Sequence, residues 1–233
     1  MDEKTKVGSI KNANMGKEID LLASYPKSKR NLDNRENFKT DKNITIARKF
    51  GKEFFDGSRE TGYGGFSYNP KYWSEVVKKF KEYWKLTSEN SILDIGCAKG
   101  FMLYDFSLLI PGLKIKGIDI SSYAIKNSIE KVKNNLQVCD AKKLPFEANS
   151  FDYSISINTI HNLEMDECAE AIKEIDRVSK KSSFLTVDAY RNEAEKKRMF
   201  KWNLTAKTIM SVEEWKTFFK KVNYKGDYYW FIP

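Results

Sequence analysis

The stretch "SILDIGCAKGFML", residues 91–103, decides the fold of this chain. It begins as a short apolar run of the kind found in a buried strand, and an apolar helical stretch starts at Phe101. Gly96 and Gly100 lie between the two, where the absence of side chains lets the backbone turn sharply and approach a ligand. The positive end of the following helix then points toward that ligand. The stretch therefore predicts a cofactor-binding turn, but it does not by itself say which cofactor binds.

The residues of this turn exclude two familiar phosphate-binding motifs. Dinucleotide enzymes carry G-x-G-x-x-G, but Ala98 and Phe101 occupy the second and third glycine positions here. A P-loop is also excluded, because Gly100 is not followed by Lys-Ser or Lys-Thr. Asp94, two residues before the first glycine, would repel a phosphate and attract an amine. A cationic, amine-bearing cofactor therefore fits better than a pyrophosphate.

Short apolar runs alternate with amphipathic helical stretches from Ile92 onward. The expected strands are "ILDI", "LKIKGIDI", "LQVC", "FDYSISI", "SFLTVDA" and "DYYWFI". The expected helices span residues 101–109, 123–133, 166–179, 192–201 and 211–222, the last opened by a capping box of Ser211 and Glu214. This alternation predicts an α/β fold over residues 87–233, a doubly wound, mostly parallel sheet with helices on both faces. Ligands of such sheets bind beyond the carboxyl ends of the strands.

The first 86 residues are expected to form two further parts. Residues 1–43 are polar and charged, which predicts an arm that is partly irregular. Residues 44–86 are expected to form a helical cap, with a helix over 44–55 and a second helix from Pro70 to about Trp84. The loop between them, "DGSRETGYGGFSYNP", is rich in glycine and aromatics. It is expected to act as a lid whose rings attract a cation, or else to be an ordinary connection with buried aromatics.

The composition restricts the class of partner. A net charge of +9 and a pI of about 9.2 would suit a polyanion. Lysine far outnumbers arginine, however, and nucleic-acid recognition depends mainly on arginine. We therefore expect a generally solvated lysine surface that attracts an anionic small substrate, and nucleic acid is disfavoured.

The cysteines and the apolar runs predict a cytoplasmic protein without a metal site. Cys97, Cys139 and Cys168 are odd in number and form no CxxC pair, so neither a disulfide framework nor a zinc site is expected. No apolar run approaches the roughly 18 residues of a membrane span. The first residues, "MDEKTKVGSIKN", also lack the apolar core of a signal peptide.

The stretch "DIGCAKG" resembles the first motif of the class I S-adenosylmethionine-dependent methyltransferases, acidic-x-Gly-x-Gly-x-Gly, with Ala98 in the middle glycine position. The similarity continues through "KGIDIS", "VCDAKKLPFEANSFD" and "LPFEANSFDYSISINTIHNL". It covers residues 91–190 in the family's order. One such motif is weakly specific, whereas the ordered set is strongly specific. For each carboxylate taken singly, the alternative is a residue that only caps a turn or a helix.

The resemblance implies that the cofactor is S-adenosylmethionine and that the product is S-adenosylhomocysteine. It places the ribose hydroxyls at Asp119, and the adenine amino group at Asp140 beside the backbone amide of Ala141. The implied cofactor-binding residues are Asp94, Gly96, Cys97, Ala98, Gly100, Asp119, Ile120, Asp140, Ala141 and Asn158.

The resemblance also implies a Rossmann-like sheet of seven strands that is closed by an antiparallel hairpin. Only one candidate closing strand, "DYYWFI", precedes Pro233. Either the seventh strand is missing or an earlier segment supplies it. An exposed edge strand would favour a homodimer over a monomer.

The acceptor of the methyl group is expected to bind between the cap and the loops after the fourth and fifth strands. His161, the only histidine, follows the fourth strand, and its ordinary pKa suits a general base near neutral pH; the alternative is a packing role. Arg191 would pair with a carboxylate or phosphate, or else be an exposed charge. The candidate catalytic residues are His161, Asn158 and Tyr190, and the candidate substrate-binding residues are Tyr63, Phe66, Tyr68, His161, Arg191 and Trp202.

Missing motifs restrict the acceptor further. Asn158 is not followed by Pro-Pro-aromatic, the motif of DNA amino-methyltransferases, and the cysteines expected for arsenite methylation are missing. We therefore expect transfer to oxygen or nitrogen of a small polar metabolite, such as a sugar or another specialised metabolite, by analogy with similar bacterial stand-alone methyltransferases of unassigned acceptor. One alternative is an RNA or protein methyltransferase that uses the basic arm around Lys27, Lys29 and Arg30. Another is a cofactor-binding regulator without enzymatic activity.

Overall fold

The computed structural model describes residues 16–27, 32–64 and 67–233. Seven strands form one sheet in the order β3-β2-β1-β4-β5-β6, and β7 also pairs with β5. Every strand pairing in this described part is parallel. The strands are β1 (Ser91–Ile95), β2 (Lys114–Asp119), β3 (Leu136–Val138), β4 (Phe151–Ile157), β5 (Ser179–Tyr190), β6 (Met210–Ser211) and β7 (Asp227–Phe231).

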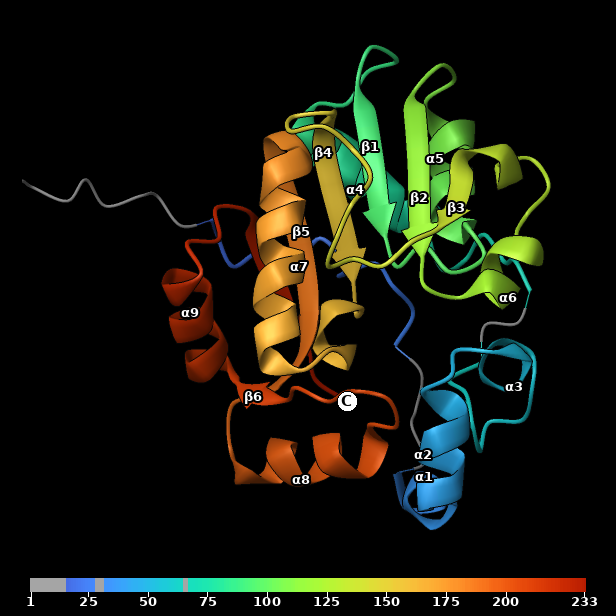
Figure 1. Cartoon of the computed structure of the whole chain (residues 1–233), viewed down its shortest axis with the longest axis vertical. Coiled ribbons are helices and arrows are strands. Elements are labelled where there is room, and N and C mark those ends of the chain that lie inside the picture. The colour runs from blue at the N-terminus through green and yellow to red at the C-terminus, as the bar shows by residue number, and fades with distance from the viewer. Residues whose placement is uncertain (1–15, 28–31, 65–66) are drawn as a thin grey trace, which may run out of the picture.

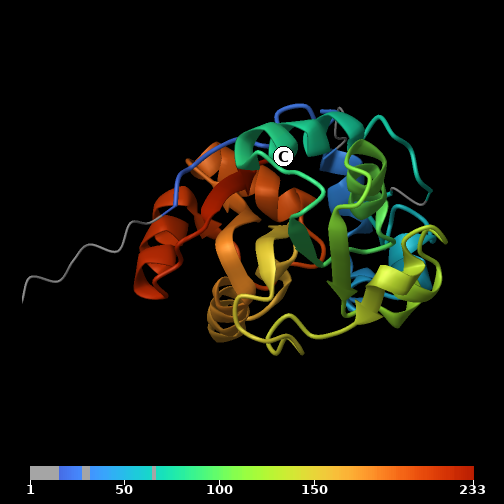
Figure 2. The same cartoon turned by 90° about the horizontal axis from the view of Figure 1, so that it is seen from above.

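Helices cover both faces of the sheet, which confirms the doubly wound α/β fold (Figures 1 and 2). One face carries α4 and α5, and the other carries α7 and α9. In Figure 1, α1, α2, α3 and α8 lie beyond the strand ends that carry the arrowheads. The helices are α1 (Leu32–Phe38), α2 (Asp41–Ala47), α3 (Lys52–Phe55), α4 (Ser74–Trp84), α5 (Phe101–Leu109), α6 (Ser122–Lys126), α7 (Met165–Val178), α8 (Glu193–Trp202) and α9 (Val212–Lys221), with the 3₁₀ turns η1 (Lys133–Asn135) and η2 (Ile160–Asn162).

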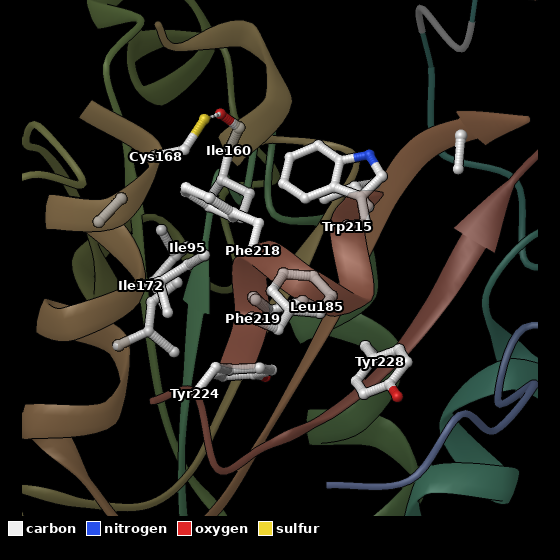
Figure 3. Packing of buried hydrophobic residues seen from close by; sticks show 14 of the residues in the cluster. Ile95, Ile160, Cys168, Ile172, Leu185, Trp215, Phe218, Phe219, Tyr224 and Tyr228 are labelled. Atoms are coloured by element: carbon white, nitrogen blue, oxygen red, sulfur yellow. Dashed lines mark hydrogen bonds between the residues drawn. The ribbon is translucent and has the colours of Figure 1, made fainter. Parts of the chain in front are cut away.

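Two apolar cores, one on each face, hold the helices to the sheet. Successive side chains of a strand point to opposite faces. Leu93 and Ile95 of β1 therefore belong to the core under α7 and α9, and Ile92 belongs to the core under α4 and α5. Figure 3 shows the first core, in which Ile172 of α7 and Trp215 of α9 lie among the side chains that cover the sheet. Because both faces are covered, Ile92, Leu93 and Ile95 of β1 do not alternate with exposed polar residues, and Asp94 is the one charged residue among them.

The helix expected over residues 44–55 is wrong as a single element. Helix α2 ends at Ala47 and α3 begins at Lys52. Between them Phe50 has a left-handed backbone, with φ of 48°, which a continuous right-handed helix does not allow. The helix expected over 123–133 is also shorter, because α6 ends at Lys126.

The N-terminal part lies partly on the face of the sheet and partly over its carboxyl edge. Helix α4 packs on the face beside α5. Helix α1 lies inside the segment that the sequence presents as a polar arm, whereas residues 1–15 fall outside the described part. We call residues 32–64, which contain α1, α2, α3 and the loop that follows them, the N-terminal cover.

The sheet has its seventh strand, but the expected antiparallel closure is wrong. Strand β7 runs parallel to β5, with Phe184 opposite Asp227. The reason is that helix α9 connects β6 to β7, and a helical crossover returns the chain in the same direction. An earlier segment also contributes at this edge, because Glu18 forms a parallel bridge with Tyr228. Within the described residues, no helix has both the length and the apolar character that crossing a bilayer requires.

Candidate cofactor and acceptor sites

The glycine turn after β1 has the backbone of a ligand-binding loop. The φ angles of Gly96, Ala98 and Gly100 are 85°, 49° and 78°, all in the left-handed region. A Cβ atom at Gly96 would lie 2.0 Å from the hydroxyl oxygen of Thr159, so any side chain there would collide. Ala98 keeps its unusual conformation while its N–H donates to Oδ2 of Asp119 at 2.8 Å. The alanine that departs from the glycine motif is therefore held by the carboxylate at the end of β2.

Asp94 is a buried carboxylate at the centre of the sheet. It lies on β1 between Gly117 of β2 and Ile155 of β4, and only 4% of its surface is exposed. Burial, together with repulsion from Asp119, raises the pKa of Asp94 to about 8. No other described residue donates a hydrogen bond to it. An ammonium group nearby would stabilise the ionised form, so Asp94 fits the amino group of a cofactor with an amino-acid end.

Asp119 ends β2 and anchors the glycine turn. Its Oδ2 accepts from the N–H of Ala98, and its Oδ1 accepts from the N–H of Ser121, each at 2.8 Å. Burial raises the pKa of Asp119 although both backbone hydrogen bonds lower it. Each oxygen of a carboxylate has a second lone pair. The two oxygens can therefore accept the paired hydroxyls of a ribose without releasing the turn.

Apolar side chains are exposed beside this carboxylate. Ile120 is 56% exposed after β2, and Val138 is 51% exposed at the end of β3. A flat aromatic base placed here would remove both from water. Asp140 lies two residues after the end of β3, and its Oδ1 accepts from the N–H of Lys142 at 2.9 Å, with Ala141 between the two residues. The implied cofactor residues of β1, β2 and β3 thus lie along one edge of the sheet.

The N-terminal cover is bonded to this cofactor half. Asp56 accepts from Nζ of Lys99 at 2.5 Å and from the hydroxyl of Tyr123 at 2.7 Å. Lys99 belongs to the glycine turn and is 6% exposed. The hydroxyl of Ser121 donates to the carbonyl of Phe50 at 2.5 Å. The break between α2 and α3 therefore contacts the residues that follow β2.

The N-terminal cover is also bonded to the segment after α8. Arg48 donates to the carbonyls of Thr205 and Ala206 at 3.3 and 3.1 Å. The N–H of Leu204 donates to the hydroxyl of Tyr63 at 2.9 Å. The cover thus spans the carboxyl edge of the sheet, from the glycine turn to residues 202–206. We call the region formed by residues 202–206, the carboxyl ends of β4 and β5 and the part of the cover that contacts them the acceptor half.

His161, Asp188 and Asn203 form a buried polar cluster in the acceptor half. The N–H of Asp188 donates to Nδ1 of His161 at 3.0 Å, and the Asn203 amide donates to Oδ2 of Asp188. Burial lowers the pKa of His161, and the opposing effect of Asp188 is smaller. A neutral ring whose Nδ1 accepts a hydrogen bond carries its proton on Nε2. The geometry therefore favours a hydrogen-bond donor at Nε2 over the general base that the sequence suggests.

Asn158 lies between the two halves and is tied to β5. It has a left-handed backbone with φ of 51°, and its Oδ1 accepts from the hydroxyl of Thr186 at 2.9 Å. Asn162, which sequence reasoning missed, has a buried Oδ1 to which no group in the described part of the chain donates a hydrogen bond. Its amide nitrogen lies 3.4 Å from the carbonyl of Asn158. A ligand donor in this corner would satisfy the orphaned oxygen.

Tyr63 and Trp202 lie together in the acceptor half, with ring centroids 5.5 Å apart. Arg35 of α1 lies over both rings, and its Cζ atom is 4.7 Å and 5.3 Å from the two centroids. Sequence reasoning missed Arg35, because it sits in a polar segment and 167 residues separate it from Trp202. No local pattern marks such a long-range contact.

Two of the sequence-predicted residues, at the end of β5 and directly after it, have partners outside the His161 cluster. Tyr190 has its hydroxyl 3.5 Å from Glu214, at the start of α9. Arg191 is about half exposed and pairs with Glu195 at 3.8 Å. The structure therefore places both on the surface around α8 and α9.

The remaining predicted residues lie on the other side of the cover or cannot be placed. Tyr68 donates to Oδ1 of Asp105 at 2.5 Å, next to the first turns of α5. Phe66, Lys29 and Arg30 fall outside the described residues.

Neither metal ligation nor thiol chemistry is indicated in the described part of the chain. It contains no group of three His, Cys, Asp or Glu residues arranged to hold a metal ion. Cys97 is 5% exposed, and burial with the nearby charges of Asp94 and Asp119 raises the pKa of its thiol well above the ordinary value. A thiol of this kind is an unreactive packing group.

A strand, a glycine turn and a helix, with two buried carboxylates at the carboxyl edge of a parallel sheet, form the Rossmann-like arrangement that the resemblance to S-adenosylmethionine-dependent methyltransferases implies. Residues 86–230 match the model of the family described as Methyltransferase domain, Methyltransf_31. The match covers more than half of the chain, and the chain belongs to this family of enzymes.

Curated relatives of the chain act on different acceptors. A tRNA (carboxymethyluridine(34)-5-O)-methyltransferase of Arabidopsis thaliana is 36% identical over 132 residues, which cover 56% of this chain and 31% of that protein. A malonyl-[acyl-carrier protein] O-methyltransferase of Legionella pneumophila is 34% identical over 74 residues, which cover 30% of this chain and 26% of that protein. The chain thus spans less than a third of the length of either relative.

Solved structures share the fold. A phosphoethanolamine N-methyltransferase of Haemonchus contortus, in complex with phosphomonomethylethanolamine and S-adenosylhomocysteine, has a TM-score of 0.52 and 22% identity over 81% of this chain and 44% of that chain. The YcgJ protein of Bacillus subtilis has a TM-score of 0.51 and 19% identity over 63% of this chain and 66% of that chain. At these identities the similarity is one of fold alone.

Proposed function

We propose that this enzyme transfers the methyl group of S-adenosylmethionine to oxygen or nitrogen of a small polar metabolite and releases S-adenosylhomocysteine. The observation that carries the proposal is the N-terminal cover, which is bonded to Lys99 on the cofactor half and to Leu204 on the acceptor half. A segment fixed across the carboxyl edge in this way suits an acceptor small enough to be enclosed. A sugar or another specialised metabolite meets that description.

The residues of the cofactor half have separate tasks in this proposal. Asp94 would bind the amino group, Asp119 the ribose hydroxyls, and Ile120 with Val138 the adenine ring, while Asp140 would accept from its amino group. Bound there, S-adenosylmethionine supplies a methyl group already activated on a sulfonium. Any proton that the acceptor atom carries would pass to solvent after the transfer, because His161 holds its own proton on Nε2. What the chain must add is alignment of the acceptor with that methyl group and exclusion of water.

The acceptor half would provide the alignment. His161 is fixed by the N–H of Asp188, so its Nε2–H is a donor of constant direction. It would hold an acceptor oxygen or nitrogen while leaving a lone pair free for the methyl group. Tyr63 and Trp202 would form an aromatic wall that excludes water.

The test is incubation of the purified protein with isotope-labelled S-adenosylmethionine and a metabolite extract, followed by mass spectrometry of the small molecules. We expect a labelled small product that does not form with Asp119→Ala. Affinity for S-adenosylmethionine without any labelled product would contradict the proposed activity, and would favour a cofactor-binding regulator.

A second candidate is methylation of RNA, which is favoured by the similarity to the Arabidopsis tRNA methyltransferase and by the net charge of +9. Binding to RNA through lysines would weaken steeply as salt increases. Transfer of label to RNA, with salt-dependent binding, would establish this function in place of the first. Absence of RNA binding at low salt would remove it.

A further inference from the structure

Arg35 has an unusual setting for a side chain that is 6% exposed. Its Nε donates to the carbonyl of Trp202 at 3.2 Å. Its Nη1 donates to the carbonyls of Arg59 and Gly62 at 2.5 and 3.0 Å. Together with the rings of Tyr63 and Trp202, these contacts fix the guanidinium plane and leave it no freedom to swing into water.

The remaining nitrogen of Arg35 is unsatisfied. Nη2 is buried from water and has no hydrogen-bond partner among the residues that the structure describes. The groups that Nε and Nη1 contact are neutral carbonyls, which accept hydrogen bonds but do not cancel the charge. An unpaired buried charge is strongly destabilising, and such charges are normally paired.

No nearby carboxylate of the described residues supplies the missing charge. Burial is the main cause of the lowered pKa of Arg35, the neighbouring phenol of Tyr63 opposes it, and the charge of Arg59 lowers the pKa of Arg35 further. Glu36, its neighbour on α1, pairs instead with Lys201 at 2.7 Å. The site is therefore electropositive, rigid and short of one anion.

The unpaired charge of Arg35 lies next to the acceptor half. The hydroxyl of Tyr63 accepts from the N–H of Leu204. Asn203, the residue before Leu204, donates from its side-chain amide to Asp188 of the His161 cluster. A chain of contacts through Tyr63, residues 203–204 and Asp188 therefore connects the guanidinium to His161. A charged group at Arg35 and a reacting group at His161 can belong to one small molecule.

We propose that Nη2 of Arg35 binds a carboxylate or phosphate group of the methyl acceptor. This inference rests on the proposed function and narrows the acceptor to an anionic metabolite. Only the two N–H bonds of Nη2 are free, so the anion is held at one nitrogen rather than by the full guanidinium fork. The faces of Tyr63 and Trp202 keep the pair away from water, which strengthens the attraction.

The experiment measures binding of two probes, inorganic phosphate and acetate, to the protein saturated with S-adenosylhomocysteine. The variant is Arg35→Gln, and the matched control is Arg198→Gln, which removes an exposed arginine of α8. We expect saturable binding of at least one probe to the parent and the control, and about 10- to 100-fold weaker binding to Arg35→Gln. Phosphate alone would indicate a phosphorylated acceptor, and acetate alone a carboxylic acid. Equal binding by Arg35→Gln and the parent would overturn the proposal.

A second variant and a measurement on the parent protect the test against misfolding. Arg35→Lys keeps the charge but cannot keep all three carbonyl contacts in one plane, so we expect intermediate probe affinity. If neither variant folds, probe binding to the parent protein is the test. Saturable binding of phosphate or acetate supports the proposal, and absence of binding overturns it. A labelled product that is neutral would overturn the anionic acceptor while leaving the methyltransferase activity intact. Probe binding without any labelled small product would instead contradict the proposed function.

Discussion

The backbone N–H of Asp188 donates a 3.0 Å hydrogen bond to Nδ1 of His161, which joins the end of β5 to the turn that follows β4. Because a backbone N–H can only donate, Nδ1 must be the unprotonated nitrogen. The proton of the neutral ring is then on Nε2. A histidine in this state can orient an acceptor but cannot take its proton at Nε2.

Replacement of His161 tests whether the residue donates a hydrogen bond or accepts a proton. We expect His161→Ala to lower kcat by about 100-fold, as for the loss of one oriented donor, and to leave the Kd of S-adenosylmethionine unchanged. His161→Gln places an amide N–H near the position of Nε2–H, so it should recover part of kcat. Steady-state kinetics with the identified acceptor provide the measurement. Equal loss in both variants would indicate a base, and equal activity of His161→Ala and the parent would remove the residue from the mechanism.

His161 should also make stability depend on pH. Burial holds its pKa in the folded protein below the ordinary value of 6.5. The unfolded chain therefore binds the proton first, and the contribution of His161 to stability is complete above pH 6.5 and is lost as pH falls through the folded pKa. The midpoint of thermal unfolding should fall between pH 7 and 5 less steeply in His161→Gln than in the parent. The same slope in both proteins would contradict the assignment.

Asp94 should destabilise the cofactor-free protein as pH rises. Its pKa rises from an ordinary value of 3.8 to about 8, so its contribution to stability is complete below pH 3.8 and is lost by about pH 8. Asp94→Asn removes the buried charge, and we expect a higher unfolding temperature than the parent at pH 8. The same change should weaken S-adenosylmethionine binding by about 10- to 100-fold, because a charge-assisted hydrogen bond is lost. Calorimetry and thermal unfolding on the same samples test both effects, and tight binding by the variant would contradict the role of Asp94.

Asp119→Ala should weaken S-adenosylmethionine binding by at least about tenfold. The substitution removes the acceptor of the ribose hydroxyls and leaves the N–H groups of Ala98 and Ser121 without their partner. Isothermal titration measures the change. Asp166→Ala, at an exposed carboxylate of α7, is the matched control and should bind as the parent does. Unchanged affinity in Asp119→Ala would break the assignment of this half of the site.

Asp56 is expected to control the dissociation rate of S-adenosylhomocysteine. Although burial alone would raise its pKa, hydrogen bonds from Lys99 and Tyr123 lower it, so this contact persists until the pH falls below the ordinary value of 3.8. We expect Asp56→Asn to release S-adenosylhomocysteine several-fold faster, about the effect of one partly buried ion pair. Glu75→Gln is the control, because its pair with Lys78 is exposed and lies on α4. Stopped-flow dissociation rates that are equal in both variants would show that the contact does not restrain the cover.

The cofactor half could be predicted from the sequence because its signals are local. The strand, the turn from Gly96 to Gly100 and the helix after it lie within one short stretch, and their order fixes where the ligand lies. Asp94 and Asp119 follow from the same logic, since Asp94 is the penultimate residue of β1 and Asp119 ends β2 of the same parallel sheet. The capping box of Ser211 was likewise readable, because its two members are three residues apart.

The acceptor half could not be predicted in the same way because long-range contacts build it. Arg35 is a buried charge only because α8 and the loop after α3 fold over it. The left-handed backbone of Phe50 breaks a helix that the apolar spacing favours, and its carbonyl bonds to Ser121. The parallel direction of β7 likewise depends on the crossover through α9 rather than on the residues of the strand.

The N-terminal cover is bonded to both halves of the carboxyl edge. It contacts the glycine turn through Asp56 and the segment after α8 through Arg48 and Tyr63. We therefore expect movement of this single segment to expose both ligands together, so that the two products leave by one route. We expect rapid formation of the first equivalent of product, followed by a slower steady rate that product departure determines. The steady-state turnover rate would then be set by the N-terminal cover, a segment whose own residues do not react.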